Sequence, residues 1–531
     1  MGARREEEEM GEDHEGRTYK TFTEVKGTLT PQEERFERWR NTSGLFLGPI
    51  VAIALYSIPM PSISQKAHVL AAIIGWVVVW WITEPIPIPV SALLGAVLCV
   101  LFGVASAKVA FAPFADPIIY VFLGSFIIAE AMAIQGLDRR FAYAIMSLKW
   151  VGDSAGRILF AYGFIAAFIS MWISNTATTA MMFPIGLGIV HAMAEMTTAK
   201  TGKEIDPYRM RYATGMMLMA AYAASAGGIG TPVGTPPNLI GIAMIDRFAG
   251  VRIPFFQWML FAIPLLAVMF VLLHLLMYGL HRPELTRVEG SHEYVKEELR
   301  KLGNWTPGQK NVLLAFLITV ALWIIPGFLA LLYGANSSPF KAYSNYLPEG
   351  AAALVGATLL FILPTNWKKR EFTISWRQAA RIDWGTLLLF GGGLTLGSLM
   401  FDLKLAEAVG KGLLNWAGAT SLWGVTFSAI YISILVSEAT SNTASANMVV
   451  PVMIALSQAG GINPVPPAIG ATLGASWGFM LPVSTPPNAI VYGSGMVPIT
   501  KMIRAGFIFD LVGGVLIWLG LRVLLPLVGL A

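Results

Sequence analysis

Long apolar stretches separated by short polar segments fill most of the 531-residue chain from residue 44 onward. A helix needs about 20 consecutive apolar residues to cross a bilayer, and about eleven stretches are long enough. They lie near 44–61, 67–83, 88–107, 117–136, 212–246, 256–280, 311–333, 348–365, 384–401, 466–498 and 506–529. The pattern predicts an all-α polytopic membrane protein with about eleven transmembrane helices.

Two further apolar segments, 155–190 and 423–457, each carry the polar triplet Ser-Asn-Thr near the middle. Each is either one crossing helix or a re-entrant hairpin with the triplet at its tip. Cytoplasmic loops carry an excess of lysine and arginine. This rule is satisfied when both segments are hairpins and the N-terminus is cytoplasmic. We therefore predict an inner-side hairpin at 155–190, an outer-side hairpin at 423–457, and the C-terminus outside.

Composition agrees with this class, since the chain is 55% hydrophobic and only 13% charged, whereas soluble domains are about a quarter charged. Residues 1–43 read as a cytoplasmic tail without the apolar core of a signal peptide. Residues 281–310 read as a cytoplasmic linker between the halves 44–280 and 311–531. The single cysteine, Cys99, excludes a disulfide framework within one chain.

The two triplets belong to a longer repeat within the chain. A constant offset of 267 residues maps Asp116 onto Asp383 and Ser174-Asn175-Thr176 onto Ser441-Asn442-Thr443. After a polar insert near 197–211 the offset becomes 250, and it maps Thr235-Pro236-Pro237-Asn238 onto Thr485-Pro486-Pro487-Asn488. An odd number of predicted crossings, five, separates Asp116 from Asp383, so the second copy is upside down. The repeat therefore predicts inverted topology, with the hairpins meeting near the midplane.

The motifs place polar and helix-breaking residues inside apolar segments, where unpaired backbone groups are costly. A helix that stops there exposes its last carbonyl groups or its first N–H groups. Carbonyl and hydroxyl oxygens suit Na⁺, whereas N–H groups at the positive end of a helix suit a carboxylate. The amides of Asn175 and Asn442 can bind a cation through oxygen and an anion through nitrogen. One Ser-Asn-Thr is typical of a helix cap, but the duplicated motif pair favours a site shared by both halves.

Over residues 40–531 the sequence resembles the divalent anion/sodium symporter family, which includes sodium-coupled dicarboxylate and citrate transporters. The resemblance rests on both Thr-Pro-Pro-Asn loops and on Ser174–Ala180 (SNTATTA), Ser441–Asn447 (SNTASAN) and Trp80–Leu94 (WWITEPIPIPVSALL). It implies a homodimer in the lipid bilayer, in which each protomer moves a transport part against a scaffold part by an elevator motion. We expect Na⁺ as the coupling ion, and neither an organic cofactor nor a nucleic-acid partner.

The resemblance also implies roles for individual residues. The first Na⁺ site would use Ser170, Ser174, Asn175 and the Gly234 carbonyl. The second would use Ser437, Asn442 and the Ser484 carbonyl, with Ser441 nearby. Substrate carboxylates would meet Asn175, Thr176, Thr235, Asn442, Thr443, Thr485 and Pro486.

Two positions depart from the commonest family pattern. Threonine is frequent at the position of Ser437, which keeps the hydroxyl, and alanine is frequent at the position of Ser484. The Ser484 hydroxyl could touch the substrate or fill space. No lysine or arginine lies in the predicted site, so a buried anion would depend on bound cations for charge balance. We therefore expect Na⁺ to bind first and to complete the substrate site.

Two lesser features call for an interpretation. Glu438 precedes the second triplet and could be a proton or cation group, because ionisable residues inside the membrane are functional by default. Its repeat partner is Met171, so we prefer a structural role outside the symmetric site. The glycine runs 227–230 and 391–393 predict close helix packing and not phosphate loops.

We predict a secondary active transporter, and not an enzyme, that couples Na⁺ to a di- or tricarboxylate of the succinate, malate and fumarate class or to citrate. The alternatives on the same fold are a Na⁺-independent dicarboxylate exchanger and a sulfate transporter. A membrane-embedded enzyme would need clustered acid, base or metal ligands, and Glu130, Glu438 and His274 form no such cluster in sequence. A channel is disfavoured because a closed site with two motifs suits occlusion.

Overall fold

The computed structural model describes residues 31–531, apart from 203, 289, 335–336 and 418–420. Helices make up nearly all of the regular structure, and the strands β1 (Pro364–Asn366) and β2 (Glu371–Phe372) form one short antiparallel pair. The predicted all-α fold class is confirmed. Most of the tail predicted for 1–43 lies outside the described residues.

Helices follow one another with short connections through both halves. The first half contains α3 (Pro31–Ser57), α4 (Gln65–Thr83), α5 (Ile88–Leu101), α6 (Ala107–Phe111), η1 (Ala112–Ala115), α7 (Pro117–Gln135), α8 (Leu137–Met146), α9 (Ala155–Ser170), α10 (Asn175–Thr201), η2 (Pro207–Arg209), α11 (Arg211–Gly227), η3 (Gly228–Gly230), α12 (Pro236–Met244), η4 (Ile245–Ala249) and α13 (Phe255–Leu280). The linker contains α14 (Ser291–Lys301). The second half contains α15 (Pro307–Tyr333), α16 (Ser338–Tyr346), α17 (Glu349–Ile362), α18 (Trp376–Ala379), α19 (Trp384–Asp402), α20 (Leu405–Ala417), α21 (Leu422–Ala439), α22 (Asn442–Ala459), α23 (Val465–Ala475), α24 (Pro486–Tyr492) and α25 (Ile499–Leu527).

Eight helices in the described residues are long and apolar enough to cross a membrane. They are α4, α7, α10, α13, α15, α19, α21 and α25. Six of these coincide with predicted crossings, while α10 and α21 are arms of the two predicted hairpins. The remaining predicted crossings fall on α3, α5, α17 and the interrupted pairs α11/α12 and α23/α24. A polytopic helical membrane protein is confirmed, whereas the number of crossings stays a prediction.

The first described helix starts earlier than the sequence predicts. α3 runs unbroken from Pro31 and therefore crosses the boundary predicted at residue 43. Ion pairs one turn apart support its charged first turns, because oppositely charged side chains at this spacing lie side by side. Arg38 pairs with Glu34 at 2.7 Å, and Arg40 pairs with Glu37 at 2.8 Å.

Helices of one half pack against helices of the other half. α5 packs on α19, and α7 packs on α17, although each pair joins distant parts of the chain. A Cβ on Gly124 would lie 2.6 Å from the Cβ of Ala353, and a Cβ on Gly392 would lie 2.7 Å from that of Ala92. Such contacts leave no room for side chains, so the close packing predicted for the run 391–393 is confirmed.

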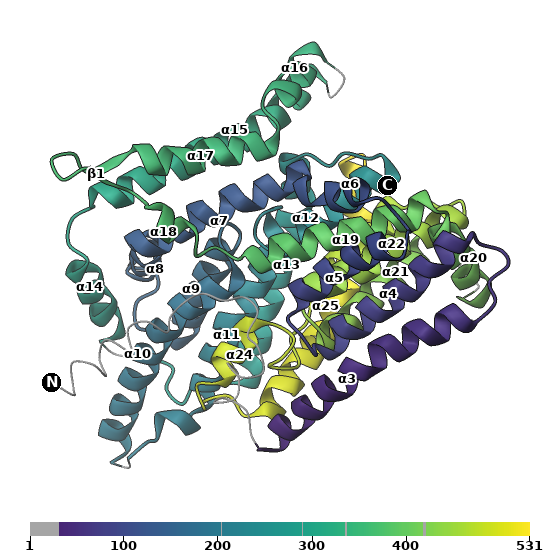
Figure 1. The fold of residues 1–531 in the computed structure, drawn as a ribbon. Coiled ribbons are helices and arrows are strands. Elements are labelled where there is room, and N and C mark those ends of the chain that lie inside the picture. The colour runs from purple at the N-terminus through teal and green to yellow at the C-terminus, as the bar shows by residue number, and fades with distance from the viewer. Residues whose placement is uncertain (1–30, 203, 289, 335–336, 418–420) are drawn as a thin grey trace, which may run out of the picture.

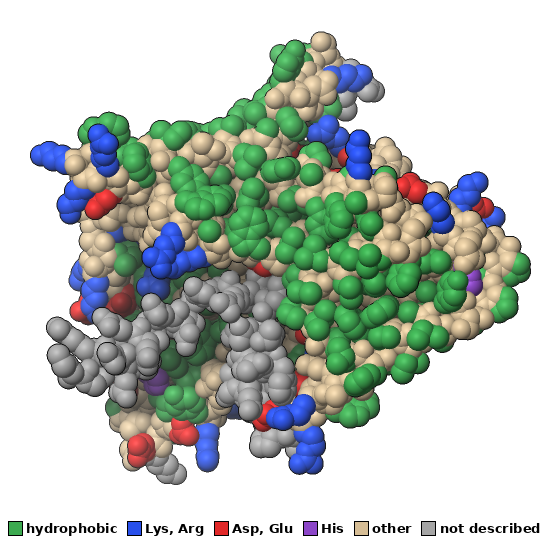
Figure 2. All heavy atoms as spheres, viewed as in Figure 1, with side chains coloured by type: hydrophobic (Ala, Val, Ile, Leu, Met, Phe, Trp, Pro, Cys, Tyr) green, Lys and Arg blue, Asp and Glu red, His purple; other side chains and the backbone are tan. Residues whose placement is uncertain are grey.

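The outer surface fits a membrane environment. Figure 2 shows hydrophobic side chains spread over the centre of one face, with most of the lysine and arginine side chains along its periphery. Large apolar side chains such as Phe46, Ile53 and Leu101 are more than half exposed to the surroundings. A soluble protein rarely exposes so much contiguous apolar surface, whereas lipid accepts it without cost.

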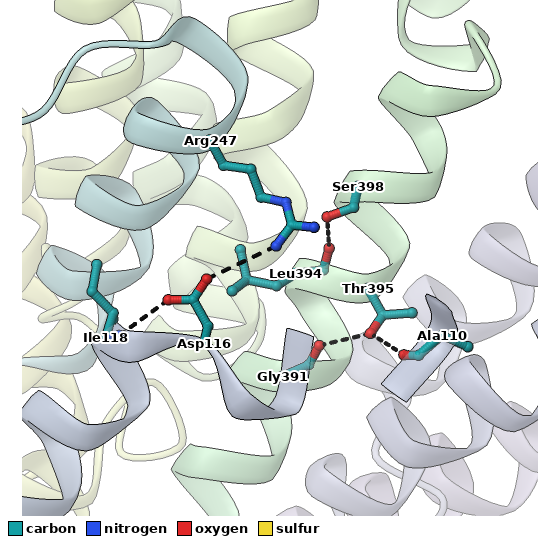
Figure 3. A network of polar contacts seen from close by, with 8 residues as sticks. All are labelled: Ala110, Asp116, Ile118, Arg247, Gly391, Leu394, Thr395 and Ser398. Carbon is teal, nitrogen blue, oxygen red and sulfur yellow. Dashed lines mark hydrogen bonds and ion pairs between the residues drawn. The ribbon is translucent and has the colours of Figure 1, made fainter. Parts of the chain in front are cut away.

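A polar network joins η4 to the start of α7 (Figure 3). Arg247 reaches from η4 to within 3.8 Å of the Asp116 carboxylate, which also accepts the Ile118 N–H over 3.0 Å. Thr395 on α19 donates to the Ala110 carbonyl over 2.7 Å. The network therefore connects the segment that follows the first Thr-Pro-Pro-Asn loop to α7, while α19 is fastened to α6.

Candidate functional site

Both Ser-Asn-Thr triplets lie where one helix has ended and the next one begins. Ser174 is the N-cap of α10, and its Oγ accepts the Ala177 N–H over 3.2 Å. Ser441 caps α22 in the same way, with its Oγ 3.2 Å from the Ala444 nitrogen. Each Asn-Thr pair therefore occupies the first turn of a helix, where free N–H groups and the helix dipole favour an anion.

The Thr-Pro-Pro-Asn loops interrupt helices in both halves. α11 ends at Gly227 and α12 starts at Pro236, just as α23 ends at Ala475 and α24 starts at Pro486. Thr235 and Thr485 stand at the N-cap positions. Proline suits the first helical position because its missing N–H would be unpaired there.

An asparagine holds each loop in shape. The Asn238 amide nitrogen donates to the carbonyls of Gly228 at 3.0 Å and Thr231 at 2.7 Å. The Asn488 amide nitrogen donates to Gly478 at 3.3 Å and to Leu481 at 3.0 Å. Sequence reasoning assigned no role to these two asparagines, although their repetition within the motif was an available signal.

Four oxygen atoms gather at the first triplet. The Ser170 hydroxyl donates to the Asn175 amide oxygen over 2.7 Å. The same amide oxygen lies 3.2 Å from the Ala224 carbonyl oxygen and 3.3 Å from the Gly234 carbonyl oxygen. A half-turn of the amide would bring its nitrogen there as a donor, and a bound cation would equally satisfy the oxygens. The structure thus brings Ser170, Asn175 and Gly234 together, and adds the Ala224 carbonyl.

A similar oxygen cluster lies at the second triplet. The Ser437 hydroxyl is 2.8 Å from the Asn442 amide oxygen and 2.8 Å from the Ala475 carbonyl oxygen. One hydroxyl proton can serve only one of these acceptors, so the cluster is again rich in oxygen atoms. Ser484 lies close by, and Gly478 lies between the two serines. A Cβ added to Gly478 would be 3.1 Å from Ser437 Oγ and 3.4 Å from Ser484 Cβ.

The Ser484 hydroxyl is engaged by Glu438. It donates to Glu438 Oε2 over 2.7 Å, while Glu438 Oε1 accepts the Met480 N–H over 2.8 Å. The Leu481 N–H also reaches Oε2 at 3.2 Å. The Glu438 carboxylate therefore fastens the loop between α23 and α24, in agreement with the structural role preferred for it.

The two motif pairs meet through crossed packing of the halves. α12, which starts at the first Thr-Pro-Pro-Asn loop, packs on α22 of the second triplet. α24, which starts at the second loop, packs on α10 of the first triplet. Of the predicted substrate ligands, Asn175, Thr176, Asn442 and Pro486 are partly exposed, whereas Thr235, Thr443 and Thr485 are buried.

Fixed positive charge is scarce in the interior. Among the lysine and arginine residues that the structure describes, only Arg140 is buried. Its guanidinium donates to the carbonyls of residues 302–304. The described part of the chain also holds no group of three or more histidine, cysteine, aspartate or glutamate residues arranged to bind a metal ion. At the triplets, the N-termini of α10 and α22 provide partial positive charge.

Comparisons with known proteins agree on one family. The family model described as the sodium:sulfate symporter transmembrane region matches residues 40–528. The sodium-dependent dicarboxylate transporter SdcS of Staphylococcus saprophyticus is 34% identical over 486 residues, which are 91% of each chain. SdcS of Staphylococcus aureus strain USA300 is 34% identical over 491 residues, again 91% of each chain.

Two solved structures share the fold at low sequence identity. The YdaH transporter of Alcanivorax borkumensis has a TM-score of 0.50 and 15% identity, covering 93% of this chain and 97% of its own. MtrF of Neisseria gonorrhoeae has a TM-score of 0.52 and 13% identity, covering 92% of this chain and 98% of its own. At such identities the likeness concerns the fold alone.

Proposed function

The chain belongs to the sodium:sulfate symporter family, and from this membership we propose that it couples Na⁺ entry to uptake of small di- or tricarboxylates. It is a multi-pass membrane transporter and not an enzyme. The substrates in view are succinate, malate and fumarate, with citrate as a further candidate. The sodium-dependent dicarboxylate transporters among its relatives support this assignment.

The observation that carries the proposal is the pair of oxygen clusters. Each cluster combines a serine at the end of one helix, the asparagine that begins the next helix, and main-chain carbonyls. Interrupted helices use such carbonyl ends to coordinate Na⁺. We therefore assign one Na⁺ to Ser170, Asn175 and Gly234, with Ser174 capping beside it. A second Na⁺ is assigned to Ser437, Asn442 and Ser484, with Ser441 in the equivalent cap position.

The substrate would lie between the two clusters. Asn175 and Thr176 present the N-terminus of α10, and Asn442 and Thr443 present that of α22. Thr235, Thr485 and Pro486 stand where α12 and α24 begin. The first turns of α10 and α22 supply N–H donors for two carboxylates, and the dipoles of all four helices supply partial positive charge. The two Na⁺ ions would supply the remaining charge balance.

An elevator motion within a homodimer fits the packing. The motif-bearing helices pack on one another across the halves, as do α5 with α19 and α7 with α17. We assign the motif-bearing helices to the mobile transport part, and α5, α7, α17 and α19 to the scaffold part. The repeats 44–280 and 311–531 would then have opposite orientations, with a cytoplasmic N-terminus and the C-terminus outside.

A sulfate transporter is the second candidate, because the matching family model is described by sodium and sulfate. Both ligands are divalent oxyanions, and helix N-termini bind either of them. The number of anion sites distinguishes the two substrates, since a dicarboxylate needs two separated sites and sulfate needs one. The presence of two equivalent triplets favours the dicarboxylate.

Uptake by purified protein in proteoliposomes tests the proposal. We expect labelled succinate to accumulate under an inward Na⁺ gradient, and Asn175→Ala or Asn442→Ala to abolish uptake while the surface variant Asn366→Ala retains it. Sulfate accumulation without succinate accumulation would favour the second candidate. Succinate uptake that needs an internal dicarboxylate and ignores Na⁺ would identify an exchanger. Full activity in either triplet variant would overturn the paired site.

A further inference from the structure

A basic and aromatic surface lies in the connection between α17 and α19 (Figure 1). α19 is long and apolar enough to cross a membrane, and α17 is so together with α16. The connection, residues 363–383, contains the β1–β2 hairpin and α18. It carries five lysine and arginine residues but only two acidic residues. Because it is a short link between two spans, we expect it to lie at one surface of the membrane.

The turn of the hairpin presents three basic side chains in succession. Residues 367–370 read Trp-Lys-Lys-Arg, and all four are exposed. The Lys369 N–H donates to Asn366 Oδ1 over 3.2 Å, and the Arg370 N–H donates to the Trp367 carbonyl over 3.2 Å. Arg370 has a φ of 53°, which residues other than glycine adopt only at a cost. The turn therefore has a defined backbone path that keeps its charges together.

The base of the hairpin is fastened to the transmembrane helices. From the start of α15, the Asn311 amide nitrogen donates to the Pro364 carbonyl over 3.0 Å and to Thr373 Oγ1 over 2.9 Å. From the end of α7, the Gln135 amide nitrogen donates to the Thr373 carbonyl over 2.8 Å. The basic turn is thus held in one place relative to the spans, which lowers the entropy lost when it binds a ligand.

The positive charge of the turn is not used within the protein. Residues 368–370 form no ion pair with a carboxylate in the described part of the chain, although Glu371 follows them directly. The linker helix α14 differs, because each of three basic side chains there pairs with a glutamate. These pairs are Lys296 with Glu293 at 4.0 Å, Arg300 with Glu293 at 3.3 Å and Lys301 with Glu298 at 2.6 Å.

Three exposed tryptophans accompany the charges. Trp367 in the turn, Trp376 at the start of α18 and Trp384 at the start of α19 are 74%, 66% and 45% exposed. Indole rings with this exposure suit the membrane–water interface, because the ring is apolar and its N–H is polar. Figure 2 shows lysine and arginine side chains beside hydrophobic ones at the corner of the molecule that β1 occupies in Figure 1.

We propose that the β1–β2 hairpin and α18 bind the head groups of anionic phospholipids. The lysine and arginine side chains donate charge-assisted hydrogen bonds to lipid phosphates, while the tryptophan rings enter the interfacial layer. A lipid surface fits better than a soluble acidic partner, since lipid head groups already surround a link between two spans. The predicted topology places this surface on the cytoplasmic side, where anionic lipids attract basic segments.

The lipid contact would also fix part of the molecule in the membrane. The hairpin is hydrogen-bonded to α7 and follows α17 directly, and both helices are assigned to the scaffold part. Bound lipids would thus hold the scaffold in position while the transport part moves. This anchoring role rests on the proposed function, whereas the binding of anionic lipid does not.

Quenching of tryptophan fluorescence by brominated lipids in proteoliposomes tests the proposal without any transport. The contribution of Trp367 is the difference between each protein and the same protein carrying Trp367→Phe. In a phosphatidylcholine bilayer, brominated phosphatidylglycerol should half-quench Trp367 at a mole fraction at least about tenfold below that of brominated phosphatidylcholine. Equal quenching by the two lipids would overturn the proposal and leave a soluble acidic partner as the alternative.

Charge-removing variants locate the preference. Lys368→Gln/Lys369→Gln/Arg370→Gln should bring the ratio of the two mole fractions close to one. The matched control Lys296→Gln/Arg300→Gln/Lys301→Gln removes equal charge from α14 and should leave the ratio unchanged. In wild-type protein, about 1 M KCl should also abolish the preference, because it shortens the screening length to about 3 Å. A preference that survives in the hairpin variant, is lost equally in the α14 variant or ignores salt would contradict the proposal.

Discussion

At the scale of single residues, the first oxygen cluster depends on the absence of a side chain at Gly234. A Cβ there would lie 2.5 Å from the Gly228 carbonyl oxygen and 2.9 Å from those of Ser170 and Met171. Three carbonyl groups therefore crowd around the glycine backbone. In the other half Ser484 occupies the equivalent position, and its side chain turns to Glu438. Each half thus reaches the same loop path by different local contacts.

Gly234→Ala should disturb Na⁺ binding more than folding. The added methyl group must push carbonyl oxygens apart, and overpacking of this kind costs about 1–3 kcal/mol. Such a cost would raise the Na⁺ concentration for half-maximal uptake at least about fivefold. Gly279→Ala is the control, because no atom lies within 4 Å of the added Cβ. An unchanged Na⁺ activation curve for Gly234→Ala would show that its carbonyl does not coordinate the ion.

The residues of the motifs could be predicted from the sequence because they occur twice. Repetition does not reveal geometry, however, and the roles of Asn238 and Asn488 became visible only when their amides were seen to hold loop carbonyls. The Ala224 carbonyl was also beyond prediction, since main-chain ligands leave no residue signature. Glu438 illustrates the opposite case. A charge in an apolar hairpin is conspicuous, but the N–H groups of Met480 and Leu481 that it accepts lie in a loop after another helix.

At the scale of helices, the breaks were predictable and some of the ends were not. Serine caps and prolines in the first turn place helix starts at Asn175, Asn442, Pro236 and Pro486. The sequence allows a short helix over residues 31–40, but its continuation into the first span was not predicted. These charged turns are stabilised in part by Glu84, which lies 3.7 Å from Arg40. That contact joins two helices and is invisible in a local sequence pattern.

The ion pair between η4 and the start of α7 should slow the proposed elevator motion (Figure 3). Arg247→Ala removes a partly exposed pair, and such pairs contribute at most about 1 kcal/mol. The rate of succinate uptake should therefore rise by no more than about fivefold, with little loss of stability. Lys411→Ala breaks an exposed pair within α20 and should leave the rate unchanged. If Arg247→Ala takes up succinate at the wild-type rate, this ion pair does not slow the motion.

At the scale of the whole molecule, the crossed packing of the halves is the main organising feature. The offsets of the repeat predict that the halves correspond, and in the structure helices of one half pack on helices of the other, α5 on α19 and α7 on α17. How the halves interlock could not be predicted, because it depends on which glycine meets which alanine across 229 or more residues of chain. The close approach of Gly124 to Ala353 and of Gly392 to Ala92 determines how the helices of the two halves fit together.

Acid should destabilise the fold through His281, which follows α13 and lies against Gly215 of α11. Burial, together with the charges of Lys501 and Arg504, lowers the pKa of His281 from 6.5 to about 4. Between these pH values the unfolded chain binds a proton that the folded protein does not. Stability is therefore complete above about pH 6.5 and falls by up to about 3 kcal/mol as the pH drops to 4. The melting temperature of His281→Gln should fall less than that of wild type over this range, and an identical fall would contradict the assignment.

Equilibrium binding of labelled succinate to the purified protein, in sodium buffer and in sodium-free choline buffer, tests the central claim most directly. We propose that the two oxygen clusters hold cations before a doubly charged anion enters a site without lysine or arginine. We therefore predict saturable binding in sodium, with Asn175→Ala and Asn442→Ala both deficient, and no measurable binding in choline. Binding that persists unchanged in choline would contradict the account.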